Sequence, residues 1–159
     1  MLQREGEVRI PSGCAIAGII NRQGERCRIH CAAGHDGYNN SILKAYQRGT
    51  PRPRADLVYD QDRSWLNTCQ HCPDAPCMNG CITGALQQDE QGVIYVDEEF
   101  CVSCYTCIML CPYGHIHVGP QAVHKCDLCR GRSGQPACVD ACPNGALRLI
   151  DEGESLCSM

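Results

Sequence analysis

Three dense cysteine blocks between residues 69 and 142 constrain this chain more than any other feature of its 159 residues. They hold twelve of the sixteen cysteines and read Cys69-x2-Cys72-x4-Cys77-x3-Cys81, Cys101-x2-Cys104-x2-Cys107-x3-Cys111 and Cys126-x2-Cys129-x8-Cys138-x3-Cys142. The middle block, with Pro112 behind it, has the spacing that holds a cubane [4Fe–4S] cluster, in which three thiolates reach one cube and the fourth ligates a neighbouring cube. The spacing therefore predicts an electron carrier.

Cysteine makes up about a tenth of the residues, a content that is also typical of disulfide-rich and zinc-binding proteins. A secreted, disulfide-stapled fold would need an export signal, and we expect none, because residues 1–10 carry four charges with no long apolar stretch behind them. A zinc ribbon places its ligand pairs well apart, whereas the middle block crowds four thiolates together. We therefore expect iron–sulfur clusters.

Hydropathy and charge restrict the partners. No apolar run approaches the roughly 20 residues that a membrane helix needs, so we expect no membrane insertion. Oxygen-labile clusters and the missing export signal favour the cytoplasm. The formal charge is −4, and four oxidised cubes with their thiolates would bring it to about −12, which disfavours nucleic acid as a partner. Four cations near the third block are expected either to offset cluster charge and tune potentials or to be solvated: Lys125, Arg130, Arg132 and Arg148.

An internal repeat accompanies the blocks. The segment Cys81-Ile-Thr-Gly-Ala-Leu86 matches Cys142-Pro-Asn-Gly-Ala-Leu147, and Cys111-Pro-Tyr-Gly114 is a shorter copy. Each copy predicts a helical turn near the fourth cysteine and a short strand after it. Residues 92–96 are the strongest strand candidate, and residues 116–118 and 147–150 are weaker ones. Outside the blocks, residues 34–40 read as a loop and residues 41–48 as two helical turns.

At Cys69-Gln-His-Cys-Pro-Asp-Ala-Pro-Cys77 and Lys125-Cys-Asp-Leu-Cys129 the sequence resembles the polyferredoxin-like electron-transfer subunits of molybdenum and tungsten oxidoreductases, such as those of dimethyl sulfoxide reductase and formate dehydrogenase. The resemblance covers about residues 65–150. It implies an α+β fold of two pseudo-symmetric ferredoxin-like modules, with short strands and helices around [4Fe–4S] clusters.

The same resemblance implies a non-catalytic subunit. It would pass single electrons along a row of clusters between a large catalytic oxidoreductase subunit and a second redox protein or flavoprotein subunit. We favour a tungsten aldehyde oxidoreductase as the complex; a formate dehydrogenase, a hydrogenase or a carbon monoxide dehydrogenase are alternatives. A free polyferredoxin that serves several enzymes is a further alternative, and copies of the chain could also stack head to tail into a conducting filament.

The resemblance also implies how the cysteines are shared, because the family's four motifs pair as second with third and first with fourth. Three complete sets follow: Cys69, Cys72 and Cys77 with Cys111; Cys101, Cys104 and Cys107 with Cys81; Cys126, Cys129 and Cys138 with Cys31. Cys81 departs from the family pattern, because Ile82 follows it where proline is usual.

The family's N-terminal motif is incomplete in this chain, which has only Cys14, Cys27 and Cys31 there. Once Cys31 completes the third set, Cys14, Cys27 and Cys142 need a fourth ligand, and Cys157 is the one cysteine left. The prediction is four [4Fe–4S] clusters, with the C-terminal tail closing the last. The alternative is three clusters, or a degraded [3Fe–4S] site, with Cys157 a loose thiol.

These assignments divide the chain into three parts. Residues 1–68 form an irregular N-terminal segment with part of the first cluster motif and a basic arm. Residues 69–150 form the ferredoxin-like modules, and residues 151–159 form a C-terminal tail. In the basic arm Arg48, Arg52 and Arg54 surround Pro51 and Pro53, which excludes a helix interior. The arm is expected either to dock an acidic partner or to be a solvated linker.

Few residues outside the cysteines are candidates for chemistry. Residues 12–25 resemble the start of glutamine amidotransferases, but Cys14 would have to become the mature N-terminus and the rest of that large domain is missing, so we expect no such activity. His71 lies inside a cysteine block and is expected to donate a hydrogen bond near a cube. The other histidines considered lack ligand spacing and are expected to be structural or exposed: His30, His115, His117 and His124. The sequence therefore predicts no catalytic residues.

Overall fold

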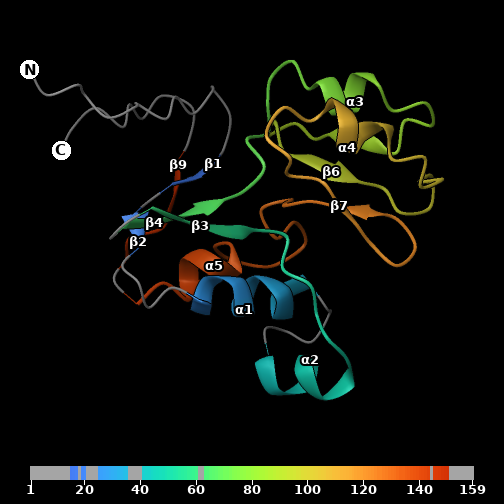
Figure 1. Ribbon diagram of the computed structural model, residues 1–159. Coiled ribbons are helices and arrows are strands. Elements are labelled where there is room, and N and C mark those ends of the chain that lie inside the picture. The colour runs from blue at the N-terminus through green and yellow to red at the C-terminus, as the bar shows by residue number, and fades with distance from the viewer. Residues whose placement is uncertain are drawn as a thin grey trace, which may run out of the picture.

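The computed structural model describes residues 15–17, 19–20, 25–35, 41–60, 63–143 and 145–150. These residues form short helices and four small antiparallel sheets, which confirms the expected α+β class (Figure 1). The longest helix is α1 (Glu25–His35), with 11 residues, and the longest strands have five. Elements this short bury little apolar surface. Much of what holds them together must come from the cysteines and what they bind.

One half of the molecule is built from the first two cysteine blocks. Helices α3 (Pro76–Asn79) and α4 (Thr106–Leu110) pack against each other, next to the hairpin of β5 (Leu86–Gln88) and β6 (Ile94–Val96) (Figure 1). A second hairpin follows, formed by β7 (His117–Val118) and β8 (Val123–His124). The buried core of this half contains Ala75, Cys77, Leu86, Ile94, Cys107, Ile116 and Val123.

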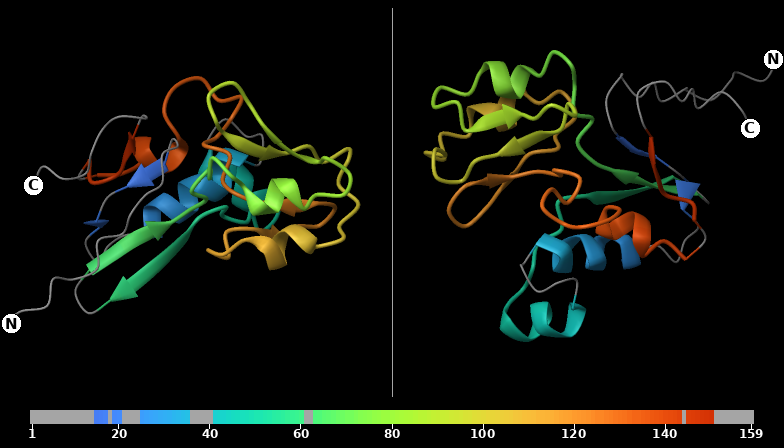
Figure 2. Two further views of the ribbon diagram at one scale, coloured as in Figure 1. Left: turned by 90° about the horizontal axis from the view of Figure 1, so that it is seen from above. Right: turned by 180° about the vertical axis from the view of Figure 1, so that it is seen from behind.

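The other half combines the N-terminal segment with the third block. Helix α1 packs against α5 (Ala137–Asp140), and β1 (Ala15–Ala17) pairs antiparallel with β9 (Arg148–Ile150). A three-stranded sheet in the order β2-β4-β3 completes this half, which lies beside the first half in Figures 1 and 2. Its strands are β2 (Ile19–Ile20), β4 (Arg63–Asn67) and β3 (Asp56–Asp60). Its buried core contains Cys27, Cys31, Ala55, Leu66, Cys69, Cys126, Cys138 and Leu147.

The strands expected at residues 92–96, 116–118 and 147–150 appear as β6, β7 and β9, and the helical turns expected at residues 41–48 appear as α2 (Ile42–Arg48). The loop expected at residues 34–40 is wrong at its start, because Gly34 and His35 end α1. Packing of α1 on α5 outweighs the poor helix propensity of glycine. Residues 36–40 lie outside the described residues. In the described part of the chain, no helix is long and apolar enough to cross a membrane.

The internal repeat is visible in the backbone. Three residues after Cys81, Cys111 and Cys142 there is a glycine with positive φ, and its N–H donates to the carbonyl of that cysteine at 3.2 Å in all three copies. The φ angles are similar, +68° at Gly84, +67° at Gly114 and +60° at Gly145. Only glycine adopts this conformation freely. The same tight turn therefore leads from the fourth cysteine of each block towards β5, β7 and β9.

Candidate iron–sulfur sites

The first two sets of four cysteines each line a hollow, one beside α4 and the other beside α3. The hollow beside α4 is lined by Cys101, Cys104, Cys107 and Cys81. The hollow beside α3 is lined by Cys69, Cys72, Cys77 and Cys111. Apolar side chains complete both walls, among them Leu86, Val96 and Val123 in one and Ile94 and Ile116 in the other.

The helices explain why each hollow takes one cysteine from the other block. Helix α3 carries Cys77, and Cys81 follows just beyond its end; α4 carries Cys107, and Cys111 is its C-terminal cap residue. Four residues span just over one helical turn, so the third and fourth cysteines are about 6 Å apart along the axis. Because α3 packs on α4, that step takes the fourth cysteine to the neighbouring hollow. The family resemblance implies this crossed sharing of ligands, which stays a prediction.

The third set lies in the other half and is deeply buried. Cys31 comes from α1, Cys138 from α5, and Cys126 and Cys129 from the loop before α5; each is at most 8% exposed. Burial raises the pKa of Cys31 to about 12 and raises that of Cys126 far above its ordinary value, and in Cys126 the neighbouring Cys31 adds to the effect. Four thiols buried together need cations between them to become thiolates, which the irons of a cluster supply.

The fourth set is only partly described. Cys27, on α1, is buried, and its pKa is raised first by burial and further by the nearby Cys142. The other two predicted members, Cys14 and Cys157, lie outside the described residues. The structure thus brings two of the four cysteines close together, and closure by the C-terminal tail stays a prediction.

The loops around the sites turn their backbone towards sulfur. The residue before the second cysteine of each block has a positive φ although it is not glycine: 46° at His71, 53° at Ser103 and 55° at Leu128. Such left-handed residues are strained and cluster at functional sites. Backbone N–H groups donate to four Sγ atoms at 3.3–3.4 Å and to a fifth at 3.5 Å; the acceptors are Cys31, Cys69, Cys129, Cys142 and Cys111. Hydrogen bonds to sulfur help to set the reduction potential of a cluster.

The described side chains form no ready-made site for a single metal ion. In the described part of the chain, no three His, Cys, Asp or Glu side chains are close enough to hold one ion. Tetrahedral zinc with sulfur at about 2.3 Å needs its sulfurs only about 3.8 Å apart. Each hollow offers four cysteines, which are the ligands that a [4Fe–4S] cube takes.

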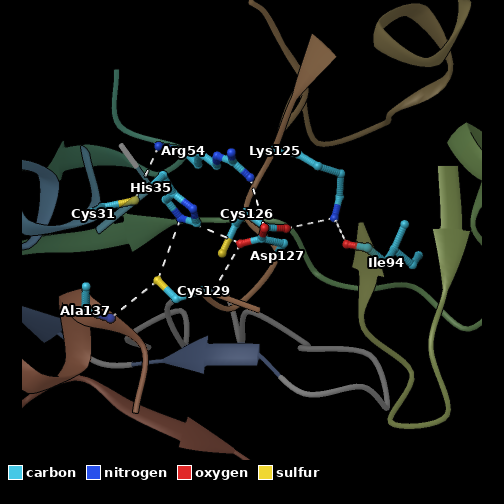
Figure 3. A network of polar contacts seen from close by, with 9 residues as sticks. All are labelled: Cys31, His35, Arg54, Ile94, Lys125, Cys126, Asp127, Cys129 and Ala137. Atoms are coloured by element: carbon cyan, nitrogen blue, oxygen red, sulfur yellow. Dashed lines mark hydrogen bonds and ion pairs between the residues drawn. The ribbon is translucent and has the colours of Figure 1, made fainter. Parts of the chain in front are cut away.

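Lys125 is the largest side chain among those that are fully buried, with 1% exposure. Its Nζ donates to the backbone carbonyls of Ile94 and Cys126 (Figure 3), and no carboxylate among the described residues lies within ion-pair distance of it. Lys125 lines the hollow of Cys69, Cys72, Cys77 and Cys111 and immediately precedes Cys126 of the third set. A buried ammonium without an anion costs several kcal/mol. Anionic clusters on both sides would compensate it.

His71 is also buried, and one of its ring nitrogens already accepts a hydrogen bond. Its Nδ1 accepts the Ile94 N–H at 2.9 Å, which places the ring proton on Nε2. Burial, with Lys125 as a lesser cause, lowers the pKa of His71 to about 3, so the ring is neutral. Nε2 has no partner among the described residues. This Nε2–H is available as the donor that the sequence predicts for a cube, and the contact itself stays a prediction.

Sequence reasoning missed a polar network beside the third set. Asp127 accepts a hydrogen bond from Arg54 at 2.9 Å and contacts His35 at 3.6 Å, while His35 Nε2 lies 3.7 Å from Cys129 Sγ (Figure 3). Burial, with Arg54 as the next cause, lowers the pKa of His35 to about 4, so its ring is neutral at pH 7. Arg54 also donates its backbone N–H to Cys31 Sγ. The position of Asp127 inside a Cys-x2-Cys loop was the only signal in the sequence.

The remaining candidate cations and histidines lie farther from the cysteines or serve the fold. Arg130 stacks on Tyr95 at 3.6 Å, and Arg132 pairs with Asp140 at 2.7 Å. Of the four cations near the third block, Lys125 alone is buried; the others are exposed or half-buried. His115 is buried, and His117 and His124 face each other across β7 and β8 with ring centres 5.6 Å apart.

Cysteine sets of this kind, on short helices and in left-handed loops, define an iron–sulfur protein. The sequence model of the 4Fe–4S dicluster domain matches residues 64–152, so the chain belongs to that family. The electron transport protein HydN of Escherichia coli K12 is 32% identical over 145 residues, which cover 80% of this chain and 81% of HydN. A Proteus vulgaris protein named as a probable iron–sulfur subunit of the Frd operon is 37% identical over 117 residues, covering 63% of this chain and 74% of that protein.

A third relative is much longer. AegA of E. coli K12 is 33% identical over 135 residues, which cover 79% of this chain but only 20% of AegA. With the relatives above, the family match shows that this chain is an iron–sulfur electron-transfer protein with [4Fe–4S] clusters.

The crossed sharing of cysteines can be tested by exchanging one ligand at a time. In Cys111→Ser we expect alkylation by iodoacetamide at Cys69, Cys72 and Cys77, because the cube that loses a ligand releases the others. In Cys81→Ser the newly labelled residues should instead be Cys101, Cys104 and Cys107. Mass spectrometry of the anaerobically labelled holoprotein locates the labels. The crossed arrangement would be contradicted if, in both variants, the newly labelled cysteines belonged to the same block as the introduced serine.

Proposed function

We propose that this chain is the electron-transfer subunit of an oxidoreductase complex. It passes single electrons along a row of [4Fe–4S] clusters between a large catalytic subunit, of the molybdenum or tungsten type, and a second redox protein or flavoprotein subunit. The main support is that three complete sets of four cysteines are packed into one short chain, with Lys125 between two of them. Neighbouring cubes in so small a body lie close enough for stepwise transfer.

The subunit role is preferred to that of a free polyferredoxin for two reasons. A relative is named a subunit, and a chain like this one forms a fifth of AegA. A tungsten aldehyde oxidoreductase is our preferred complex; a formate dehydrogenase, a hydrogenase or a carbon monoxide dehydrogenase are the alternatives. Co-purification decides between carrier and subunit: an untagged large subunit should stay with the tagged chain through anaerobic purification in the native host. Recovery of the chain alone would favour the free polyferredoxin.

We further propose four clusters, the last held by Cys14, Cys27, Cys142 and Cys157. The support is the proximity of Cys27 to Cys142. Anaerobically purified protein should then contain about sixteen irons and sixteen sulfides per chain, four for each cube. Cys157→Ser should lower the iron content by one to four or produce the EPR signal of a three-iron cluster. About twelve irons, with iron and spectra unchanged in Cys157→Ser, would reduce the proposal to three clusters.

A further inference from the structure

A basic groove lies between the two halves of the molecule, lined by residues of both. It has a volume of about 580 Å³, and the arm at residues 48–54 forms one wall while residues 119–124 form much of the other. Its charged and ring side chains are His35, Arg48, Arg52, Arg54, Glu98 and His124. The lining thus holds three arginines and one glutamate, and one of the arginines, Arg54, is paired with Asp127. This is a local reversal of charge, because the whole chain has a formal charge of −4.

The arm that forms this wall is anchored rather than solvated. Arg54 is fixed to Asp127, and Arg52 donates through Nη1 to the backbone carbonyl of Val118 at 3.3 Å. Pro53 restricts the backbone between these anchors, and Pro51 restricts it just before the first. Arg48 and Arg52 themselves are exposed. The arm therefore holds the exposed positive charge of Arg52 in a fixed place, which the interpretation as a solvated linker does not explain.

The groove lies next to the third cysteine set. Its wall residue Arg54 donates a backbone N–H to Cys31 Sγ at 3.3 Å, and its wall residue His35 lies 3.7 Å from Cys129 Sγ (Figure 3). Two of the four cysteines of that set are therefore one residue away from the groove. The four cysteines of this set are at most 8% exposed, so they are hardly reached from solvent. An occupant of the groove would be separated from two of them by a single residue.

We propose that this groove docks an acidic segment of the redox partner protein, and that electrons enter or leave the chain there through the third cluster. The proposal rests on the proposed electron-transfer function and names the part of the surface through which the electrons pass. A protein segment fits better than a small molecule, because small-molecule sites bury about 70–90% of their ligand, whereas Arg48, Gly49 and Thr50 leave this groove exposed along one side. Complementary charge steers such partners and speeds their encounter.

Charged inorganic oxidants can show where electrons enter or leave the intact holoprotein. The reduced protein is mixed in a stopped-flow instrument with the trianion tris(oxalato)cobaltate(III), and the return of cluster absorbance gives the rate. Net charge alone would repel this anion, so added salt would accelerate the reaction. Reaction through the basic groove has the opposite sign: salt should slow it, because salt screens the attraction. Acceleration by salt in the wild-type protein would overturn the proposal.

Charge reversal then tests the groove itself. Arg52→Glu and Arg48→Glu should each slow oxidation by the trianion about threefold to tenfold at low ionic strength, and should leave or raise the rate with the trication hexaamminecobalt(III). The matched control is Arg26→Glu, which reverses an exposed arginine on α1 roughly 14 Å along the helix from His35. An equal loss in the control would mean that net charge governs the rate, and the groove would be excluded.

Competition identifies the class of occupant. Poly-L-glutamate, as an acidic polypeptide, should slow oxidation by the trianion in the wild-type protein and much less in Arg52→Glu. Inhibition by a DNA oligomer without inhibition by polyglutamate would overturn the proposal, and so would inhibition by neither.

This result is separable from the underlying function. A holoprotein that is not reduced by dithionite, or that reacts with neither oxidant, would refute electron transfer itself. Normal redox cycling without a salt or variant effect would refute only the groove.

Discussion

Stripping the clusters from this protein should unfold most of the described chain. Of the five largest fully buried side chains among the described residues, only Ile94 is a hydrocarbon; the others are Lys125, His71, Thr68 and Ser64. Both apolar cores contain cysteines among their buried members, and the chain has one Phe and one Trp. Without clusters, two hollows lose their contents and Lys125 is left as a buried charge, which is strongly destabilising. Cluster binding and folding are therefore coupled.

The measurement is circular dichroism with hydrogen exchange. After oxidative removal of iron by a chelator, with the thiols then kept reduced so that no disulfides form, the far-ultraviolet spectrum should lose its cooperative thermal transition. Amide protection should fall towards that of an unfolded chain. Reconstitution with iron and sulfide should restore both signals and serves as the control. An apo-protein that melts cooperatively, with the same protected amides, would show that the polypeptide alone specifies the fold.

Replacing Lys125 with Gln should make two clusters harder to reduce. The reduced cube is more negative than the oxidised one, so a nearby ammonium favours reduction. A unit charge several ångströms away contributes about 2 kcal/mol at the effective dielectric constant of about 20 that suits buried sites, which is roughly thirtyfold in the equilibrium constant. At about 59 mV per tenfold for one electron, this lowers the potential by about 90 mV. Glutamine can still donate to the carbonyl of Ile94 or Cys126.

The effect should also be selective among clusters. Redox titrations followed by EPR should show the fall at the clusters of the first and third sets, which Lys125 adjoins, and a smaller change at the set of Cys101, Cys104, Cys107 and Cys81, whose hollow it does not line. Arg130→Gln is the matched control, because Arg130 is an exposed cation in the same block that stacks on Tyr95. Equal shifts in both variants, or none in Lys125→Gln, would contradict a local role for the buried ammonium.

The sequence predicted the parts of this protein that depend on local spacing. The α+β class, strands β6, β7 and β9 and helix α2 follow from short patterns, and the hollows contain the cysteines that the motif spacings and the family resemblance group together. The sequence did not predict the burial of Lys125, because lysine is ordinarily exposed and only the approach of Ile94 and Cys126 encloses it.

Long-range contacts account for the other omissions. Arg54 and Asp127 are 73 residues apart in sequence, and no local pattern links them. The extension of α1 through Gly34 likewise depends on α5, more than a hundred residues later. Packing between distant segments decides these features, and a periodicity within one segment carries no information about it.

The step of one helical turn between the third and fourth cysteines of a block has a consequence for how such chains can change. A block whose fourth cysteine serves the neighbouring hollow cannot complete a cube alone, so loss of a whole block breaks two sites, whereas loss of its first cysteines breaks only one. The N-terminal segment retains Cys27 and Cys31 with the spacing of a third and a fourth member. The cysteines that this segment lacks are therefore missing from the fourth set, whereas the third set, which the segment completes with Cys31, has all four.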